Sequence, residues 1–239
     1  MSDRTNEIAE FLKREEEKQK VRWQIIIEHL KKGVVFMDWK NAYIDESVTI
    51  GEGTVIWPGA ILLGNTSIGK NCVIGHNTRI EDSIIEDEVE IQNSVILESR
   101  VGSHTKVGPF AYLRPNSRIG EHAKVGDFVE VKNSTLGNHS KASHLTYIGD
   151  SDVGEHVNLG CGVVFVNYDG KNKHRSVVKD GAFVGCNTNL VSPVTVGEGA
   201  YIAAGTTVTT DVPNEALSVG RAKQKNIEGW VKKRGLLEK

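Results

Sequence analysis

Several features that mark secreted, membrane-spanning or nucleic-acid-binding proteins are scarce in this sequence. The three cysteines, Cys72, Cys161 and Cys186, are odd in number and form no CxxC pair. They argue against a disulfide framework or a zinc ribbon and favour a reducing cytosol. No apolar run approaches the ~18 residues of a membrane span, and the charged N-terminus lacks the apolar segment of a signal peptide. The formal net charge of −2 would not attract nucleic acid or an anionic membrane. These absences predict a cytoplasmic protein with no membrane or nucleic-acid partner.

Aromatic residues are also scarce, at 6%, whereas glycine is abundant, with 25 residues. That combination favours many tight turns and small-residue packing over a helix bundle. The length of 239 residues, of which 38% are hydrophobic, suits one large soluble domain or two small ones.

Aliphatic residues recur at every sixth position through most of the chain. One run extends from Ile44 to Ile80, and the pattern resumes from Val101 to Val131 and again from Val184 to Val208. A glycine often follows the aliphatic residue, and a helix cannot keep a period of six with glycine this dense. A hexapeptide repeat predicts a parallel β-helix, in which three six-residue sides make one coil and coils stack at about 4.8 Å. Five-residue slips, such as 80–85 and 131–136, are assigned to corners.

Three segments depart from the repeat. Residues 4–33 mix apolar and charged side chains and predict a helix. Residues 166–177, VNYDGKNKHRSV, predict a projecting loop, and without support on its own coil this loop would reach a neighbouring subunit. The closing NIEGWVKKRGLLEK predicts a short helical tail. The expected division is an N-terminal helix and linker (1–40), an all-β hexapeptide-repeat domain (41–214) and a C-terminal segment (215–239).

Four of the eight histidines share one position of the repeat in successive coils. This histidine ladder consists of His104, His122, His139 and His156, each three residues after an aliphatic repeat position. Rings about 4.8 Å apart suggest a metal stripe, but other repeats place glycine or asparagine at the same position. Glycine, asparagine and histidine all tolerate positive φ. The ladder is therefore interpreted as a left-handed turn position rather than a metal site.

Arg114 and Lys132 each stand where a repeat usually has glycine, one 18-residue coil apart. Two like charges at that spacing repel by about 1 kcal/mol even in water. An anion between them, such as a phosphate, would remove the repulsion. The alternatives are that both side chains extend apart into solvent, or that Glu130 neutralises Lys132.

His144 lies off the histidine ladder, two residues after Ala142. Tyr147 follows and is expected on the same side of the coil, with Asn158 on the next side. A lone histidine of this kind is more often structural than catalytic. A histidine titrates near neutral pH, however, so His144 is also a candidate general base.

Long segments of the chain match one known family. They are GPFAYLRPNSRIG, HAKVGDFVEVKNSTLGNHSKASHLTYIGD, NYDGKNKHRSVV, VSPVTVGEGAYIAAGTTVTTDVP and SVGRAKQKNIEGW. Over residues 34–231 the chain resembles the acetyltransferase half of the bifunctional N-acetylglucosamine-1-phosphate uridyltransferase/glucosamine-1-phosphate acetyltransferase (GlmU) family. The resemblance implies a left-handed β-helix, a homotrimer with active sites between subunits, and acetyl transfer from acetyl-CoA to the 2-amino group of glucosamine 1-phosphate. The product, N-acetylglucosamine 1-phosphate, serves UDP-N-acetylglucosamine synthesis and thereby the peptidoglycan cell wall.

The resemblance also implies a role for each matching residue. His144 takes the role of general base, and a backbone N–H near Cys161 would stabilise the oxyanion. The substrate-binding positions are Arg114, Lys132, Tyr147, Asn158 and Lys173. The acetyl-CoA positions are Cys161, Asn167, Tyr168, Cys186, Ala204 and Arg221. Where this chain has Cys161 and Cys186 the family often has alanine or serine, so contacts to the acyl group can differ here. Both cysteines are expected to be small, buried packing residues. No metal is expected for the acetyl transfer.

The uridyltransferase half of that family carries a glycine-rich nucleotide loop and a metal site. This chain begins with a charged segment and has no such loop, so uridylyl transfer is expected to be absent. Three other functions remain open. They are a hexapeptide acyltransferase for another amino-sugar phosphate such as galactosamine 1-phosphate, a γ-carbonic-anhydrase-like metalloenzyme that uses ladder histidines, and a non-catalytic scaffold.

Overall fold

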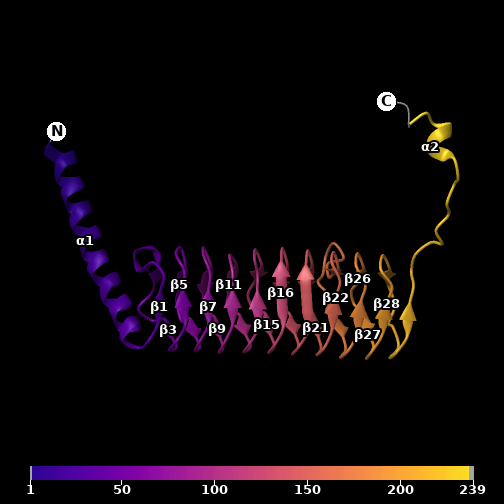
Figure 1. The fold of residues 1–239 in the computed structure, drawn as a ribbon, viewed down its shortest axis with the longest axis horizontal. Coiled ribbons are helices and arrows are strands. Elements are labelled where there is room, and N and C mark those ends of the chain that lie inside the picture. Colours follow the sequence, from indigo (N-terminus) through magenta and orange to yellow (C-terminus); the bar gives the residue numbers. More distant parts are fainter. Residues whose placement is uncertain (1, 237–239) are drawn as a thin grey trace.

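The repeat folds into a three-sided parallel β-helix with a helix at its N-terminal end and a loose segment at its C-terminal end (Figure 1). The computed structural model describes residues 2–236. Within the described residues all paired strands are parallel, and each strand pairs with the equivalent strand of the next coil, as in the register Leu113↔Val131. The predicted parallel β-helix with terminal helices is confirmed.

The three sides of the coil form three sheets, which we call A, B and C. Sheet A consists of β1 (Val35–Phe36), β4 (Val55–Ile56), β7 (Val73–Ile74), β10 (Glu90–Ile91), β13 (Lys106–Val107), β16 (Lys124–Asp127), β19 (Lys141–His144), β22 (Asn158–Leu159), β25 (Phe183–Val184), β28 (Tyr201–Ile202) and β30 (Leu217–Ser218). Sheet B consists of β2 (Tyr43–Ile44), β5 (Ile61–Leu63), β8 (Arg79–Glu81), β11 (Val95–Leu97), β14 (Tyr112–Leu113), β17 (Glu130–Lys132), β20 (Tyr147–Gly149), β23 (Val164–Val166), β26 (Asn189–Val191) and β29 (Thr207–Val208). Sheet C consists of β3 (Thr49–Ile50), β6 (Ser67–Ile68), β9 (Ile84–Ile85), β12 (Arg100–Val101), β15 (Arg118–Ile119), β18 (Thr135–Leu136), β21 (Ser151–Val153), β24 (Ser176–Val178) and β27 (Thr195–Val196).

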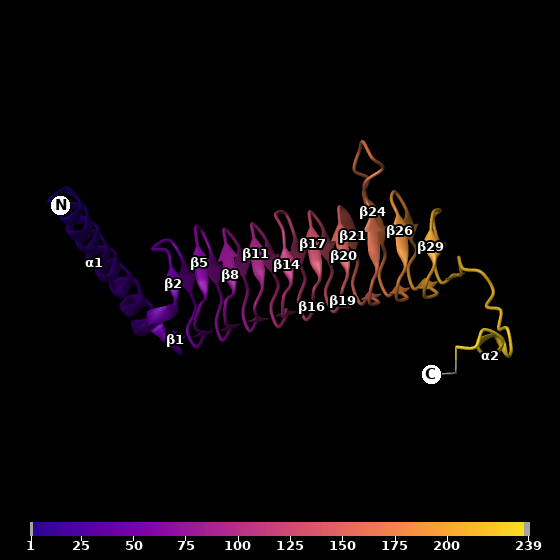
Figure 2. The ribbon, with the colours of Figure 1, turned by 90° about the horizontal axis from the view of Figure 1, so that it is seen from above.

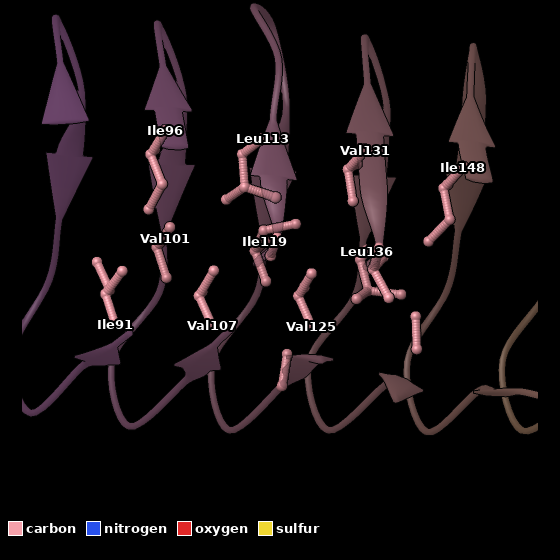
Figure 3. Close-up of a cluster of buried hydrophobic side chains, with 14 of the residues drawn as sticks. Ile91, Ile96, Val101, Val107, Leu113, Ile119, Val125, Val131, Leu136 and Ile148 are labelled. Carbon is pink, nitrogen blue, oxygen red and sulfur yellow. The ribbon is translucent and has the colours of Figure 1, made fainter. Parts of the chain in front are cut away.

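The core is the set of aliphatic repeat residues, which point inward from all three sheets (Figure 3). Ile96, Val101 and Leu113 are fully buried there, in coils related by the sequence period. Buried hydroxyls complete the corners. The Ser134 hydroxyl, for example, donates to the carbonyl of Lys132 at 2.7 Å and accepts from the N–H of Ser151 at 2.9 Å. Such bonds satisfy backbone groups that a corner takes out of the sheet.

The two ends of the chain leave the β-helix. Helix α1 (Ser2–Lys31) projects obliquely from the first coil, and only its C-terminal part packs on it, with Ile26 fully buried (Figure 1). A short 3-10 helix, η1 (Trp39–Asn41), follows β1. At the other end, helix α2 (Trp230–Lys233) lies on a segment that extends away from β30. Among residues 2–236, no helix combines the length and apolar character needed to cross a membrane.

One loop projects from the wall of the β-helix, between β23 and β24 (Figure 2). The two preceding coils of the same chain hold it at the base, contrary to the expectation that it would lack support on its own subunit. Arg175 donates to Asp152 at 2.6 Å and to the carbonyl of Asn133 at 2.9 Å. The Asp169 carboxylate accepts from two N–H groups of the loop and contacts His174 at 2.7 Å. The sequence pattern predicted the projection but could not show these anchoring pairs.

The histidine ladder is a row of left-handed turn residues, as predicted. His104, His122, His139 and His156 have φ values of 60°, 53°, 58° and 55°. Their rings stack with centroids 4.6 to 4.9 Å apart. The position is therefore constrained by the backbone conformation that the corner requires.

This geometry predicts the effect of two substitutions at His122. We expect His122→Val to lower the free energy of unfolding by about 1–2 kcal/mol, because a β-branched side chain is strained at positive φ. His122→Asn should stay within about 0.5 kcal/mol of the parent, since asparagine tolerates this conformation. Urea denaturation measures both values. Equal losses in the two variants would contradict the turn interpretation.

Candidate active site

Arg114 and Lys132 lie at the C-terminal ends of strands β14 and β17 of sheet B, one coil apart. Each has its own carboxylate partner. The Nη1 of Arg114 donates to Oε1 of Glu130 at 2.8 Å. The Nζ of Lys132 contacts both carboxylate oxygens of Asp150, at 3.2 and 3.1 Å. The suggestion that Glu130 neutralises Lys132 is thus wrong. Glu130 lies on β17, one coil after Arg114, and Asp150 directly follows β20, one coil after Lys132.

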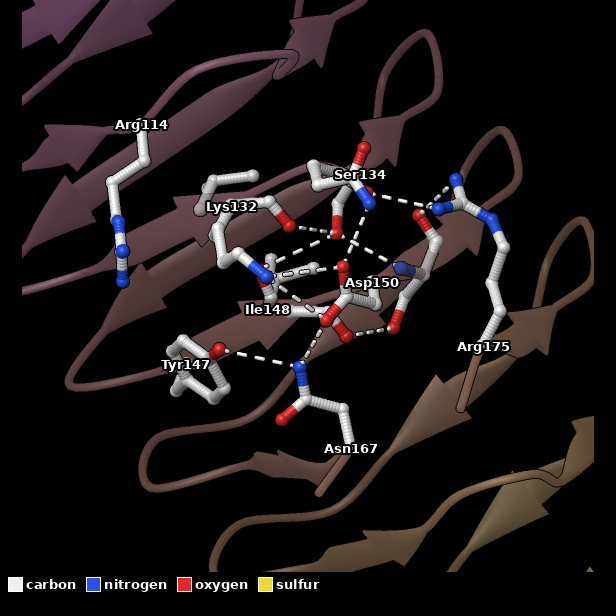
Figure 4. Close-up of polar contacts among 12 residues, drawn as sticks. Arg114, Lys132, Ser134, Tyr147, Ile148, Asp150, Asn167 and Arg175 are labelled. Carbon is white, nitrogen blue, oxygen red and sulfur yellow. Dashed lines mark hydrogen bonds and ion pairs between the residues drawn. The ribbon is translucent and has the colours of Figure 1, made fainter. Parts of the chain in front are cut away.

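Asp150 is the centre of the polar cluster at this end of sheet B (Figure 4). Its side chain also accepts from Nδ2 of Asn133 at 2.7 Å and from Nδ2 of Asn167 at 2.5 Å. The residue is only 7% exposed. Burial alone would raise the pKa of Asp150, but these hydrogen bonds and the charge of Lys132 outweigh it and lower the pKa below its ordinary value. The carboxylate therefore stays ionised and holds groups from three coils together.

Lys173 brings a third cation to the cluster from the projecting loop. Burial alone would lower the pKa of Lys132, but its contact with the Asp150 carboxylate raises the pKa overall. The nearby Lys132 lowers the pKa of Lys173. Contact with Glu130 raises the pKa of Arg114. Three cations thus share two carboxylates, and an excess of positive charge remains for an anion.

Tyr147 and Asn167 line the same cluster. The Nδ2 of Asn167 lies 3.4 Å from the hydroxyl of Tyr147, so both residues belong to the polar cluster around Asp150 (Figure 4). Tyr168 is exposed in the loop and donates its hydroxyl proton to the carbonyl of Gly170 at 2.6 Å. Asn158 lies on sheet A, paired with Lys141, and within residues 2–236 no hydrogen bond joins it to the cluster.

His144 ends strand β19 at the corner between sheets A and B. Its Nδ1 lies 2.6 Å from Oδ1 of Asp127, which ends β16 one coil earlier. The hydrogen bond from His144 lowers the pKa of Asp127. Tyr147 lies on β20 of sheet B, so the expectation that it shares a side with His144 is wrong. The chain turns between them at Leu145, whose φ is 47°.

Three residues that the family resemblance assigned to acetyl-CoA, Cys161, Cys186 and Ala204, continue the same corner, coil by coil, beyond His144. We call Asp127, His144, Cys161, Cys186 and Ala204 the corner column. The N–H of Asn187 donates to the carbonyl of Cys161 at 2.8 Å, and the N–H of Gly205 donates to that of Cys186 at 2.8 Å. Arg221 ends the column with a bond from Nη1 to the carbonyl of Ala204 at 3.1 Å. Residues far apart in the sequence therefore lie in one line.

The cysteines of the corner column are not packed in the core, and that expectation is wrong. Cys161 is half-buried and Cys186 is exposed, whereas Cys72 is buried. They follow the glycine that ends a side, where the side chain points outward from the corner. The core instead takes the repeat position and the position two residues before it, where Cys72 and Val163 lie.

The sequence reasoning missed Asp127 and Asp150. Each is one coil from a residue that it did single out: Asp127 precedes His144 by 17 positions and Asp150 follows Lys132 by 18. The coil spacing that stacks Arg114 on Lys132 also places both carboxylates one coil away, but it does not show which side chain each of them contacts.

Comparisons with known proteins find two family models that match parts of the chain and several relatives by sequence. The family model described as GMPPB C-terminal domain matches residues 39–114, and the bacterial transferase hexapeptide model matches residues 98–133 and 175–210. The chain is 61% identical over 219 residues to the bifunctional protein GlmU of Alkaliphilus oremlandii, an alignment that covers 92% of this chain and 48% of that protein. It is 55% identical over 213 residues to GlmU of Clostridium beijerinckii, covering 89% of this chain and 47% of that protein.

This chain is a relative of the GlmU proteins. It spans about half the length of the curated relatives it matches. A solved structure of Francisella novicida UDP-N-acetylglucosamine acyltransferase superimposes with a TM-score of 0.50 at 20% identity, over 84% of this chain and 74% of that one. That likeness shows the shared fold. The resemblance found from sequence motifs is confirmed by the identities to the GlmU proteins.

The Asp150 cluster generates a stability prediction. We expect Asp150→Asn to lower the free energy of unfolding at pH 7 by about 1–3 kcal/mol, because buried donors lose their charged acceptor. The folded-state pKa of Asp150 lies below its ordinary value. Its stabilising contribution is therefore present above about pH 4 and is lost as pH falls through the folded-state pKa.

The difference between parent and Asp150→Asn should accordingly shrink as the pH of urea unfolding is lowered from 7 towards about 3. Glu121→Gln, which changes an exposed carboxylate of a nearby coil, serves as the control and should cost less than about 0.5 kcal/mol. A deficit of constant size at every pH would show that Asp150 does not act through its charge.

Proposed function

We propose that this chain transfers the acetyl group of acetyl-CoA to the 2-amino group of glucosamine 1-phosphate. One observation carries the proposal: the His144–Asp127 pair belongs to the corner column that continues through Cys161 to Ala204 and Arg221, and the adjoining sheet B carries the cation cluster. A proton acceptor would thus share one region of the chain with places suited to a sugar phosphate and to a CoA thioester. The kinship with GlmU proteins supports the same assignment.

The cation cluster would take the phosphate. Arg114 offers a planar fork of donors, and Lys132 and Lys173 offer ammonium groups. A dianionic phosphate among the three would remove the repulsion between Lys132 and Lys173 and favour the charged form of both. Asp150 and Glu130 hold Lys132 and Arg114 in place before the substrate arrives.

His144 would act as the general base. A carboxylate only accepts hydrogen bonds, so the ring proton of His144 lies on Nδ1 towards Asp127, and Nε2 is left as the acceptor. Nε2 takes a proton from the substrate amine as its nitrogen attacks the thioester carbonyl carbon. The C–S bond then breaks, and the CoA thiolate recovers the proton from His144.

The backbone N–H of Cys161 is placed to stabilise the oxyanion of that step. It follows β22 one coil beyond His144, and within residues 2–236 it donates no hydrogen bond to the protein. A donor already free in the folded chain needs no rearrangement to meet the developing charge.

The corner that carries His144 also presents three bulky apolar side chains to solvent. Phe110, Phe128 and Leu145 have φ values of 59°, 55° and 47° and are each more than half exposed. Other coils place Gly59, Asn77 or Gly205 at this position. Strained, exposed apolar residues favour a protein neighbour here. We propose a homotrimer with sites between subunits, and a fully active monomer in sedimentation analysis would contradict this arrangement.

No histidine of the ladder is needed for this chemistry. The described residues contain no cluster of three histidine, cysteine or acidic side chains close enough to hold a metal, so no metal site is proposed. Galactosamine 1-phosphate remains the second candidate substrate, because the phosphate cluster and the base would serve either epimer. Steady-state kinetics with both sugar phosphates decide between them.

The base assignment predicts a loss of turnover with little change in stability. His144→Ala should lower kcat for acetylation of glucosamine 1-phosphate by roughly 10²–10⁴-fold, the range of a general base. In the parent, kcat/KM should rise with pH as the general base loses its proton, and this rise should be absent in His144→Ala. His122→Asn is the control and should keep the parent kcat. If His144→Ala keeps the parent kcat while a ladder variant loses it, the metalloenzyme hypothesis should be reopened.

The phosphate assignment predicts a different kinetic signature for Arg114. Arg114→Ala should raise KM for glucosamine 1-phosphate with a smaller change in kcat, because it removes a charge that binds ground and transition states alike. KM for acetyl-CoA should stay unchanged. Arg118→Ala, an exposed arginine on the outer face of sheet C, is the matched control. An equal rise of both KM values would argue against a phosphate contact.

A further inference from the structure

Cys161 and Cys186 are equivalent residues of successive coils. The strands that precede them, β22 and β25, pair in the register Leu159↔Val184, and each cysteine follows two residues later. The register continues through the corner, since the N–H of Asn187 donates to the carbonyl of Cys161 at 2.8 Å. The two thiols therefore leave the backbone side by side and in the same direction.

The coil spacing suits a covalent link between them. In-register side chains of neighbouring coils lie 4.5 Å apart at Phe183 and Tyr201 and 4.7 Å apart at His139 and His156, measured between ring centroids. Disulfides join Cα atoms about 4.4–6.8 Å apart. Both thiols are open to reagents, one half-buried and one exposed. Cys72 provides the contrast: it is buried, and burial raises the pKa of its thiol.

We propose that Cys161 and Cys186 form a dithiol modification site that small disulfides oxidise to an intramolecular disulfide. The thiolate of the first cysteine attacks the reagent, forms a mixed disulfide and expels one thiolate. The second cysteine then attacks the protein sulfur of the mixed disulfide and expels the other. The protein loses two protons and two electrons, and the reagent is reduced to two thiols.

The position of the pair gives the modification a consequence, which rests on the proposed function. Both cysteines belong to the corner column, between His144 and the Ala204–Arg221 contact. A bridge across these two coils would change the wall along which the CoA thioester is proposed to lie. Oxidation should therefore block acetyl transfer, and bound CoA should slow oxidation.

The test treats the whole protein with oxidised glutathione and follows intact mass and peptide maps. We expect the parent to lose two hydrogens and to give one cross-linked peptide pair joining Cys161 to Cys186. Cys72→Ala should behave like the parent. Cys161→Ala and Cys186→Ala should instead retain one glutathionyl group each, because the resolving thiol is gone. Acetyl transfer by the parent should fall at least tenfold and recover with dithiothreitol.

Two results would overturn the inference at different points. A parent protein that accumulates glutathionyl groups and no cross-linked peptide would show that the cysteines are not a dithiol pair, whatever the enzyme does. A disulfide that forms at the same rate with and without saturating CoA would overturn its link to the cofactor wall. If the reduced, untreated parent shows no acetyl transfer, that result would count against the proposed function alone.

Discussion

The structure depends on in-register parallel hydrogen bonding between successive coils. Each coil must offer its N–H and C=O groups at the height of the next one, so equivalent residues stack at one strand spacing. The aliphatic repeat residues then form continuous inward columns, as Leu113 over Val131 shows. The same constraint also fixes the arrangement of the outward-facing side chains. Every outward position becomes a column too, and the chemistry of a column follows from which residues the sequence places one coil apart.

Like charges in one column are the main electrostatic problem that this constraint creates. Arg114 and Lys132 would repel each other across one coil, and each of them pairs with an acid of the following coil. Lys173 of the projecting loop adds a third positive charge, which the carboxylates of Glu130 and Asp150 do not neutralise. A site built this way is rigid before the ligand binds, because Asp150 is already saturated with donors from Lys132, Asn133 and Asn167.

Corners contribute differently from sides. A corner residue often needs positive φ, which glycine and asparagine meet without strain and which the histidine ladder also meets. Phe110, Phe128 and Leu145 also adopt positive φ, with backbone strain, at the corner that carries His144. The same corner carries His144 with Asp127, the free N–H of Cys161 and the two accessible thiols. The strained apolar residues and the His144–Asp127 pair thus share one corner, at the end of sheet A, whereas the Asp150 cluster lies at the end of sheet B.

The sequence by itself determined the architecture, because a period of six with glycine-rich corners has few other solutions. It also determined the left-handed ladder, the projecting loop and the stacking of Arg114 on Lys132, since all follow from counting positions within a coil. Only the tertiary structure decided which carboxylate each cation meets, that His144 has Asp127 as its partner, that Tyr147 lies around a corner from it, and that Cys161 and Cys186 face outward. The physical reason is that periodicity fixes backbone columns, whereas pairing and exposure depend on side-chain direction at corners, where sides of five and six residues turn the chain differently.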